Sequence, residues 1–317
     1  MITLTGLTKR FGAATAVDNL TLDIVPGRVT GFLGPNGAGK STTMRMILGL
    51  DRPSAGTALV DGRAYASLRH PLHRVGALLD AKAVHPGRSA RAHLLAMARS
   101  NGIPARRVDE VLATVGLTGV AGKRAGTFSL GMGQRLGIAG ALLGDPGVLM
   151  FDEPVNGLDP DGVRWIRQLM RSLAAEGRTV FVSSHLMSEM QLTADQLVVI
   201  GRGRLIVDAP IAEVIAGSAA TAVRVRSPHP AGLVALHDRL TARAITVEPV
   251  GTEELLVTGA EVALVGDLAH ELGVRLHELS TREASLEQAY LELTTSSLEY
   301  AGPAAGRTRE HHRQESA

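Results

Sequence analysis

The sequence of 317 residues predicts an α/β protein with a mostly parallel sheet. Strand-like and helix-like patterns alternate through the first 215 residues, which is typical of parallel βαβ units. A glycine-rich string, GPNGAGKST at 34–42, lies between an apolar strand-like run at 29–33 and a helix-like stretch that opens at Lys40. We also expect an antiparallel β portion near the N-terminus.

Composition restricts the class of protein. With 45% hydrophobic residues, the chain can bury one large core or two ordinary ones. A net charge of +2 is too small to indicate a nucleic-acid partner, and the lack of cysteine excludes thiolate metal sites. We find no secretory signal pattern and no apolar run of the roughly 20 residues that a bilayer crossing needs. We therefore expect a cytoplasmic chain without a membrane span.

The glycine-rich string fits GxxxxGK[ST], the pattern of a nucleotide phosphate-binding loop, or P-loop. Glycine lets such a loop bend tightly and bring backbone N–H groups against an anion, and the following helix adds the positive end of its dipole. Lys40 is placed to bridge the β- and γ-phosphates, and the Ser41 hydroxyl to bind Mg²⁺. The predicted binding residues are Gly34, Pro35, Asn36, Gly37, Ala38, Gly39, Lys40, Ser41 and Thr42.

A second buried strand, predicted at 147–151, ends in two acidic residues. Asp152 is suited to hold Mg²⁺ through water. Glu153 can polarise the attacking water as a general base, a role typically worth about 10² to 10⁴ in rate. The alternative is a core strand that simply stops at two solvated acids.

Three further strings favour one family of P-loop proteins: SLGMGQR at 129–135, NGLDP at 156–160 and SSH at 183–185. With the P-loop and the two acids, they resemble the ATP-binding cassette of ABC transporters over residues 1 to about 215. Within this family the chain is similar to ATPase subunits of bacterial drug and antibiotic exporters of the daunorubicin-resistance type. The resemblance implies ATP and Mg²⁺ as ligands, and a site shared by two copies, because the signature of one subunit contacts nucleotide held by the other.

The resemblance also implies roles for single residues. Ser129 and Gly131 reach the γ-phosphate, although the signature reads FSLGM here instead of LSGGQ. His185 corresponds to the switch histidine that contacts the γ-phosphate. Asp159 lies at the dimer seam, and it also suits the N-cap of the next helix. Phe11 corresponds to an aromatic that stacks on adenine, with a core aromatic as the alternative.

One position departs from the family. The family has a Gln that senses the γ-phosphate through Mg²⁺ and faces the permease, but the matching stretch VGALLD ends in Asp80. A carboxylate can bind Mg²⁺ or water, so Asp80 is a candidate metal ligand. Helical periodicity at 91–100, 106–115 and 133–143 predicts the helical subdomain that the family inserts at about 80–145. The resemblance places a permease coupling helix in the groove between this subdomain and Asp80.

Residues 216–300 predict a small α+β domain. The order βαββαβ, followed by a helix, is that of a ferredoxin-like sandwich. Its role is predicted to be dimer contact or regulation, with a purely stabilising addition as the alternative. Residues 301–317 lack periodicity and are expected to be disordered. The predicted elements are strands at 221–226, 245–250, 254–258 and 274–279 and helices at 231–242, 261–272 and 285–293.

The sequence therefore predicts an ATPase subunit, homodimeric and bound to the inner face of the membrane through a separate permease, that drives export of a drug, antibiotic or similar small molecule. The alternative is a soluble ABC-type ATPase that is not coupled to transport. Such proteins usually carry two cassettes in one chain or long insertions, which the sequence does not show. Small-molecule kinases and GTPases lack the signature and the SSH string, and GTPases need an NKxD motif that this sequence does not contain.

Overall fold

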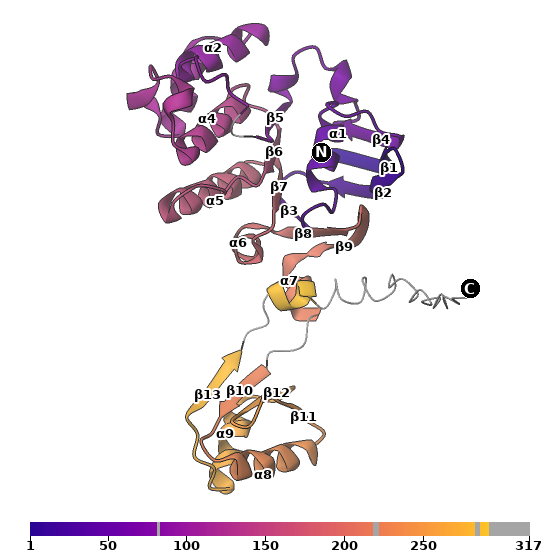
Figure 1. Cartoon of the computed structure of the whole chain (residues 1–317), viewed down its shortest axis with the longest axis vertical. Coiled ribbons are helices and arrows are strands. Elements are labelled where there is room, and N and C mark those ends of the chain that lie inside the picture. The colour runs from indigo at the N-terminus through magenta and orange to yellow at the C-terminus, as the bar shows by residue number, and fades with distance from the viewer. Residues whose placement is uncertain (81–82, 218–221, 283–285, 292–317) are drawn as a thin grey trace, which may run out of the picture.

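A computed structural model describes residues 1–80, 83–217, 222–282 and 286–291. The tail at 301–317, expected to be disordered, lies outside them. Figure 1 shows a central sheet seen nearly edge-on, with helices α2 and α4 on one side and strands β1, β2 and β4 on the other. The strands and helices at residues 222–282 form a separate unit beyond α7 (Figure 1).

The central sheet has six strands in the order β5-β6-β7-β3-β8-β9. The first five are parallel, and β9 alone is antiparallel to its neighbour, so the predicted mostly parallel sheet is confirmed. The carboxyl ends of the parallel strands therefore meet at one edge. The strands are β3 (Val29–Leu33), β5 (Val75–Leu78), β6 (Val148–Asp152), β7 (Thr179–Ser184), β8 (Gln196–Gly201) and β9 (Arg204–Pro210).

Alternation along the central strands divides the interior between two hydrophobic clusters. Leu149 and Val182 belong to the cluster that includes the helical subdomain, whereas Phe32, Met150 and Phe181 belong to the cluster under the N-terminal sheet. Both faces are thus covered, which explains why these strands are continuously apolar. Helices α5 (Pro160–Ala175) and α6 (Met187–Thr193) lie in the first cluster, and α1 (Lys40–Ile47) lies in the second.

The predicted antiparallel portion is a three-stranded sheet in the order β2-β1-β4. Its strands are β1 (Ile2–Phe11), β2 (Ala14–Ile24) and β4 (Ala55–Val60). Leu4 and Leu20 on these strands pack in the same cluster as Met44 and Ile47 of α1. The helix that follows the P-loop is thereby held between two sheets.

The segment between β5 and β6 is helical, as predicted. Its main helices are α2 (Ala90–Ser100), α3 (Arg106–Thr114) and α4 (Leu130–Leu142). Among its described residues no strand forms, apart from one isolated bridge between Ser89 and Arg124. Helix α4 begins three residues before the predicted start because Ser129 caps it, with its Oγ accepting a hydrogen bond from the Met132 N–H at 3.3 Å. The single-turn helices are Tyr65–Ser67, Pro71–His73, Thr118–Val120 and Ala125–Thr127.

The C-terminal unit has the element order predicted for a ferredoxin-like sandwich. Its strands form an antiparallel sheet in the order β11-β12-β10-β13, the arrangement of a split βαβ fold. Val225, Leu236 and Leu268 belong to one cluster between the sheet and its two helices. The elements are β10 (Ala222–Arg226), α8 (Pro230–Thr241), β11 (Thr246–Pro249), β12 (Glu254–Thr258), α9 (Val262–Glu271) and β13 (Glu278–Arg282).

The predicted position of the last strand is wrong, because β13 begins at Glu278 and not at Val274. Val274 and Leu276 alternate like strand residues, but they pack against the hydrophobic cluster outside the sheet. The Val274 N–H donates to the Ala269 carbonyl at 2.8 Å, which closes the end of α9. A chain that packs every second residue on a core imitates strand alternation without pairing.

The helical residues 286–291 return to the first domain. Sequence order places them with the C-terminal domain, but Leu286 and Tyr290 are buried in the same cluster as Met190 of α6. The Leu286 N–H also donates to Gln191 Oε1 at 3.0 Å. The C-terminal unit therefore lies, in chain order, between α7 (Ile211–Gly217) and a helix that packs on the first domain and is drawn in yellow beside α7 in Figure 1.

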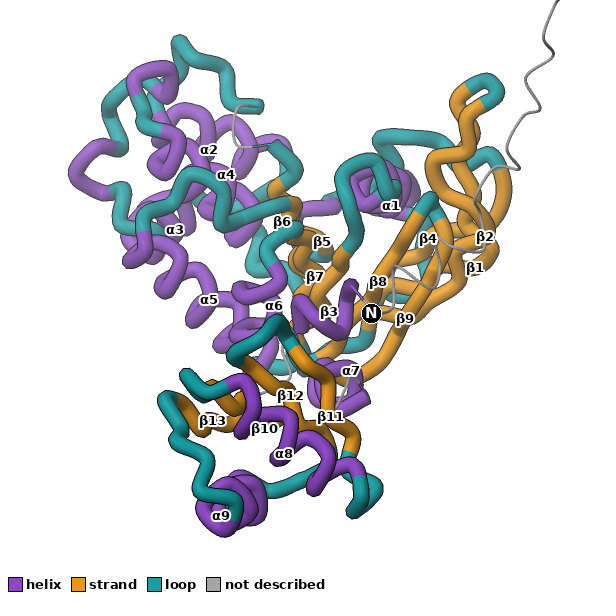
Figure 2. Tube along the Cα trace, turned by 60° about the horizontal axis from the view of Figure 1, so that its bottom comes forward, coloured by secondary structure: helices purple, strands orange, loops and turns teal. Residues whose placement is uncertain are grey.

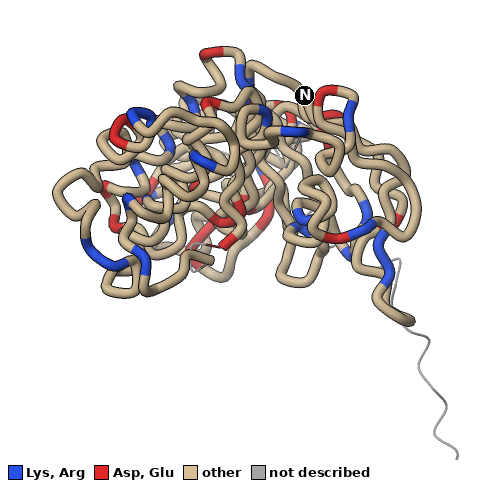
Figure 3. The backbone as a smooth tube through the Cα atoms, turned by 90° about the horizontal axis from the view of Figure 1, so that it is seen from above, with Lys and Arg blue, Asp and Glu red and all other residues tan. Residues whose placement is uncertain are grey.

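Charged residues of both signs are distributed over the molecule. In Figure 3 Lys and Arg are spread across the width of the molecule, with Asp and Glu between them. None of the helices in the described part of the chain combines the length and apolar character that a bilayer crossing demands.

Candidate active site

The candidate site forms where β3, β6 and β7 end. These strands are parallel, with β7 between the other two, so the segments that follow them converge at one edge of the sheet. The P-loop follows β3, and His185 follows β7. Asp152 is the last residue of β6, and Glu153 comes directly after it. Residues that the sequence separates by more than a hundred positions are thus brought together.

Close backbone approaches explain the P-loop glycines. A Cβ on Gly34 would lie 2.5 Å from the Ile200 carbonyl oxygen, and one on Gly39 would overlap the Ala16 carbonyl oxygen. Gly37 has φ of +81° and Gly39 +106°, which favour glycine over residues with a Cβ. Pro35, Asn36 and Gly37 at the tip are exposed, whereas Ala38 is buried. The tip of the loop is therefore accessible to solvent and to a phosphate.

Lys40 is the buried cation of the loop. It is 8% exposed, and its Nζ donates to the Gly34 carbonyl at 2.6 Å. Burial lowers the pKa of the Lys40 ammonium, while the nearby carboxylates of Glu153 and Asp152 oppose that change. Phosphate oxygens can replace the carbonyl as the acceptor and gain a stronger, charge-assisted hydrogen bond. Ser41 is exposed and Thr42 half-buried at the start of α1.

The two acids after β6 have different partners. Asp152 Oδ1 accepts a hydrogen bond from the buried Ser183 hydroxyl. Glu153 has φ of +50°, a conformation that is uncommon for a residue with a side chain, and its N–H donates to Ser183 Oγ at 3.0 Å. Its Oε2 lies 2.8 Å from His185 Nδ1. The predicted base and the predicted switch histidine are therefore in contact.

The residues present fit a Mg²⁺ ion bound together with phosphates. The part of the chain that the structure describes holds no group of three His, Cys, Asp or Glu side chains that could bind a metal without other ligands. Mg²⁺ does not require one, since it commonly uses one or two protein oxygens with water and substrate phosphates. Asp152 and Ser41 would supply those two oxygens. Asp80 is exposed two residues beyond β5, which pairs with β6, and so lies at the same edge of the sheet.

The signature residues lie away from this edge. Ser129 caps α4, which Figures 1 and 2 place on the opposite side of β5 and β6 from α1. Gly131 lies against the Gly157 carbonyl, 3.0 Å from where a Cβ would stand. Asp159 Oδ1 accepts from the Gly162 N–H at 2.8 Å, so the N-cap expected for Asp159 is present. Within one chain, Ser129 and Gly131 are therefore not brought to the P-loop.

Phe11 is not a core aromatic. It ends β1 with 52% of its surface exposed. Lys9 Nζ lies 4.8 Å from the ring centroid, a cation–π distance. The alternative of a core role is thus wrong, and the ring remains available for stacking.

Comparison with known proteins agrees with this arrangement. A family model described as ABC transporter matches residues 17–156. The uncharacterized ABC transporter ATP-binding protein YhcH of Bacillus subtilis is 37% identical over 298 residues, covering 93% of this chain and 96% of YhcH. This chain belongs to the ATP-binding subunits of ABC transporters.

Other comparisons extend the picture of this ABC ATPase. The bacitracin transport ATP-binding protein BcrA of Bacillus licheniformis is 43% identical over 213 residues, 66% of this chain and 70% of BcrA. The solved structure of CbiO1 from Clostridium perfringens, part of the ABC transporter complex CbiONQ, has a TM-score of 0.60 at 30% identity and covers 68% of this chain and 90% of that one. Residues 221–287 match a domain of unknown function, DUF8746.

Gln134 lies within the SLGMGQR string, but the sequence alone assigned it no role. In the ABC ATPase it is 4% exposed, and its Nε2 donates to the Glu153 carbonyl at 3.2 Å. Helix periodicity could have indicated that Gln134 is buried. With Ser129 as the N-cap of α4, residue 134 shares a helix face with the buried Ile138 and Ala141. A polar side chain on that face needs a buried partner.

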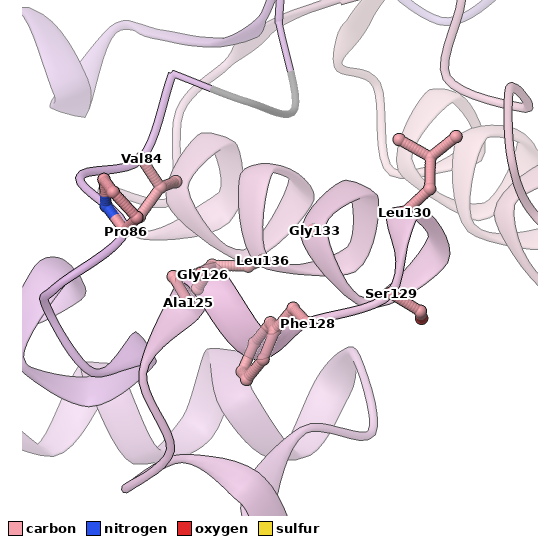
Figure 4. A pocket seen from close by; sticks show the side chains of 9 residues that line it. All are labelled: Val84, Pro86, Ala125, Gly126, Phe128, Ser129, Leu130, Gly133 and Leu136. Carbon is pink, nitrogen blue, oxygen red and sulfur yellow. The ribbon is translucent and has the colours of Figure 1, made fainter.

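A pocket of about 340 Å³ lies beside the signature. Figure 4 shows Val84 and Pro86, from the segment before α2, on one side of α4, and Phe128 on the segment that leads into Ser129. The lining is largely apolar and is built by Val84, Pro86, Ala125, Gly126, Phe128, Ser129, Leu130, Gly133 and Leu136. The segment before α2 and the segment around the start of α4 therefore form a pocket beside the predicted groove.

Proposed function

We propose that this ABC ATPase works as a homodimer that hydrolyses two ATP molecules between its subunits, and drives export of a drug, antibiotic or similar small molecule through a separate permease. The observation that carries the proposal is the separation of half-sites within one chain. The P-loop, Glu153 and His185 meet at one edge of the sheet, while α4, the helix that Ser129 caps, lies on the opposite side of β5 and β6 from α1 (Figure 1). Only a second copy can bring a signature to this P-loop.

The residues divide the chemistry of in-line phosphoryl transfer, in which positioning and charge stabilisation do most of the work. Lys40 and the P-loop N–H groups hold the β- and γ-phosphates. Glu153, held by His185 at 2.8 Å, accepts a hydrogen bond from the attacking water and directs it at phosphorus. Ser41 and Asp152 would hold Mg²⁺, which when bound would stabilise the charge that develops on the phosphate oxygens. Ser129 and Gly131 of the second copy donate to the γ-phosphate, and Phe11 stacks on adenine.

The pocket beside α4 supports a permease contact. Its apolar lining, which includes Val84, Pro86 and Leu136, suits the end of a short amphipathic helix. Asp80 precedes this segment, so a permease helix seated there lies next to a candidate Mg²⁺ ligand. Movement of the permease can then follow nucleotide state. The name of BcrA, a bacitracin transport protein, supports an antibiotic as the class of cargo.

We further propose two functional units. Residues 1–215 form the ATPase, with the helical subdomain at about 80–145. Residues 216–282 form an accessory unit for dimer contact or regulation, tied back to the ATPase by the helix at 286–291.

Reconstitution tests the proposal. The chain is purified with its permease partner, placed in lipid vesicles, and screened for compounds that raise ATP turnover and are moved across the bilayer. Ser129→Arg should abolish that turnover while each subunit still binds ATP, because a bulky cation then fills the signature N-cap. A chain whose turnover ignores both permease and cargo would instead support the ABC-type ATPase that is not coupled to transport.

A further inference from the structure

We infer that Gln134 is a positioning residue that holds the main chain of Glu153, and that it links the signature helix to the general base of its own subunit. The inference rests on the proposed function of Glu153 as that base. Gln134 lies on α4, five residues after the Ser129 N-cap. It therefore belongs to the element that is proposed to grip the partner's ATP, while its hydrogen bond reaches the chain's own site.

The contact is buried and polar. Gln134 is 4% exposed, and its Nε2 donates to the Glu153 carbonyl oxygen at 3.2 Å. Burying an amide is unfavourable unless it is hydrogen-bonded, so an apolar side chain would be the simpler choice at this position of α4. The Gln side chain is explained by its acceptor, and that acceptor is the main chain of the proposed base.

The Glu153 main chain requires support. Its φ of +50° lies in a sparsely populated region, where a residue with a side chain persists only if its surroundings hold it. The N–H donates to Ser183 Oγ at 3.0 Å, and the carbonyl accepts from both Gln134 Nε2 and the Asn156 N–H, each at 3.2 Å. Its carboxylate contacts His185 Nδ1 at 2.8 Å. Among the residues that make these contacts with Glu153, Gln134 alone comes from the helical subdomain.

This geometry connects two nucleotide sites. In the proposed dimer, the signature at the start of α4 serves the ATP of the partner, whereas Glu153 serves the ATP on its own P-loop. Because α4 is a continuous helix from Leu130 to Leu142, displacement of its N-terminus shifts Gln134 as well. Closure on one ATP therefore adjusts the carbonyl of the base at the other ATP.

The test compares Gln134→Met with Gln134→Glu. Met keeps the length and packing but cannot donate, and we expect kcat to fall roughly 10- to 100-fold with little change in KM, because small displacements of a catalytic group cost about this much. Glu keeps the shape and can donate only when protonated. Its activity relative to the unchanged protein should therefore rise as the pH is lowered, a response that a merely structural role does not give.

Gln196→Met is the matched control. Gln196 is the first residue of β8 and is 8% exposed. Its Nε2 donates to Oδ1 of Asp208 on β9 at 2.6 Å, and it makes no hydrogen bond to Glu153 among those described. It should lose comparable stability and keep its kcat. Equal changes of kcat in Gln134→Met and Gln196→Met would show that Gln134 has no positioning role and would overturn the inference. So would an activity of Gln134→Glu, relative to the unchanged protein, that does not vary with pH.

Mixed dimers separate the two directions of the link in single-turnover hydrolysis. One copy with Gln134→Met paired with a Glu153→Gln copy should be slow, because the only intact base has lost its hydrogen bond from Gln134. A copy carrying both substitutions paired with an unchanged copy should hydrolyse one ATP at the normal rate. The reverse pattern assigns Gln134 to the signature and refutes the inference. Full turnover by a Glu153→Gln homodimer would instead remove the proposed base itself.

Discussion

Replacing Lys40 by Met should abolish stabilisation by ATP while leaving the unliganded fold almost unchanged. Met keeps the length of the stem inside the P-loop and removes the ammonium. The Gly34 carbonyl loses a hydrogen bond of 2.6 Å, a cost of about 1 kcal/mol. Burial of the cation, which lowers the pKa of Lys40, is relieved at the same time. We therefore expect the free energy of unfolding without nucleotide to change by no more than about 1 kcal/mol.

The loss of ATP affinity is much larger. Two charge-assisted hydrogen bonds to phosphate contribute about 1.5 to 3 kcal/mol each, so the substitution should cost about 3 to 6 kcal/mol. This corresponds to a rise in Kd of roughly 10²- to 10⁴-fold. At ATP equal to about 100 times the Kd of the unchanged protein, binding stabilises that protein by about 2.7 kcal/mol and the variant by less than about 0.4 kcal/mol. For a domain of this size, about 2.7 kcal/mol corresponds to a rise in Tm of roughly 5 to 10 °C.

Thermal unfolding with and without MgATP measures both quantities. Lys123→Met is the control, since Lys123 is an exposed lysine in the helical subdomain. It should keep the full ATP-dependent rise in Tm. A Lys40→Met protein that ATP still stabilises like the control would refute the assignment of Lys40 to the phosphates.

Three other predictions concern the base, the permease and pH. Glu153→Gln should keep ATP binding, lose about 10²- to 10⁴-fold in turnover and accumulate as a dimer with ATP; a monomer by light scattering would contradict the shared site. Asp80→Ala should reduce cargo transport in vesicles more than ATP hydrolysis, and normal export would exclude its role in coupling. Burial and the charge of Arg88 lower the pKa of His93, so the unfolded chain binds its proton first and stability should fall as the pH drops through about 6.5. In urea unfolding between pH 7.5 and 5.5, His93→Gln should reduce this loss of unfolding free energy, whereas replacement of the exposed His70 by Gln should not. If the unfolding free energy of both variants fell equally with pH, the mechanism would be excluded.

Motifs were predictable because their chemistry depends on local residue types. The P-loop needs glycine where the backbone turns to positive φ, as at Gly37 and Gly39, or approaches another segment of the chain, as at Gly39, and such residues are visible in any sequence. The Asp159 cap likewise acts within a few residues of its own position. The order of strands and helices followed from periodicity for the same reason.

Packing decided what periodicity could not. The alternation at Val274 and Leu276 predicted a strand, but only pairing with β10 defines one, and pairing begins at Glu278. The helix at 286–291 follows the second domain in sequence and nevertheless buries Leu286 on the first. An apolar face in the sequence predicts that the face is buried, but it does not identify the element against which it packs.

The sequence by itself determined the family, the phosphate-binding loop and the acids that follow β6, because each is written in residues a few positions apart. Only the tertiary structure placed β7 between β3 and β6, set His185 against Glu153, and joined Gln134 to the main chain of the base. Those contacts depend on strand order and helix docking, which arise from burial of apolar surface across the whole domain.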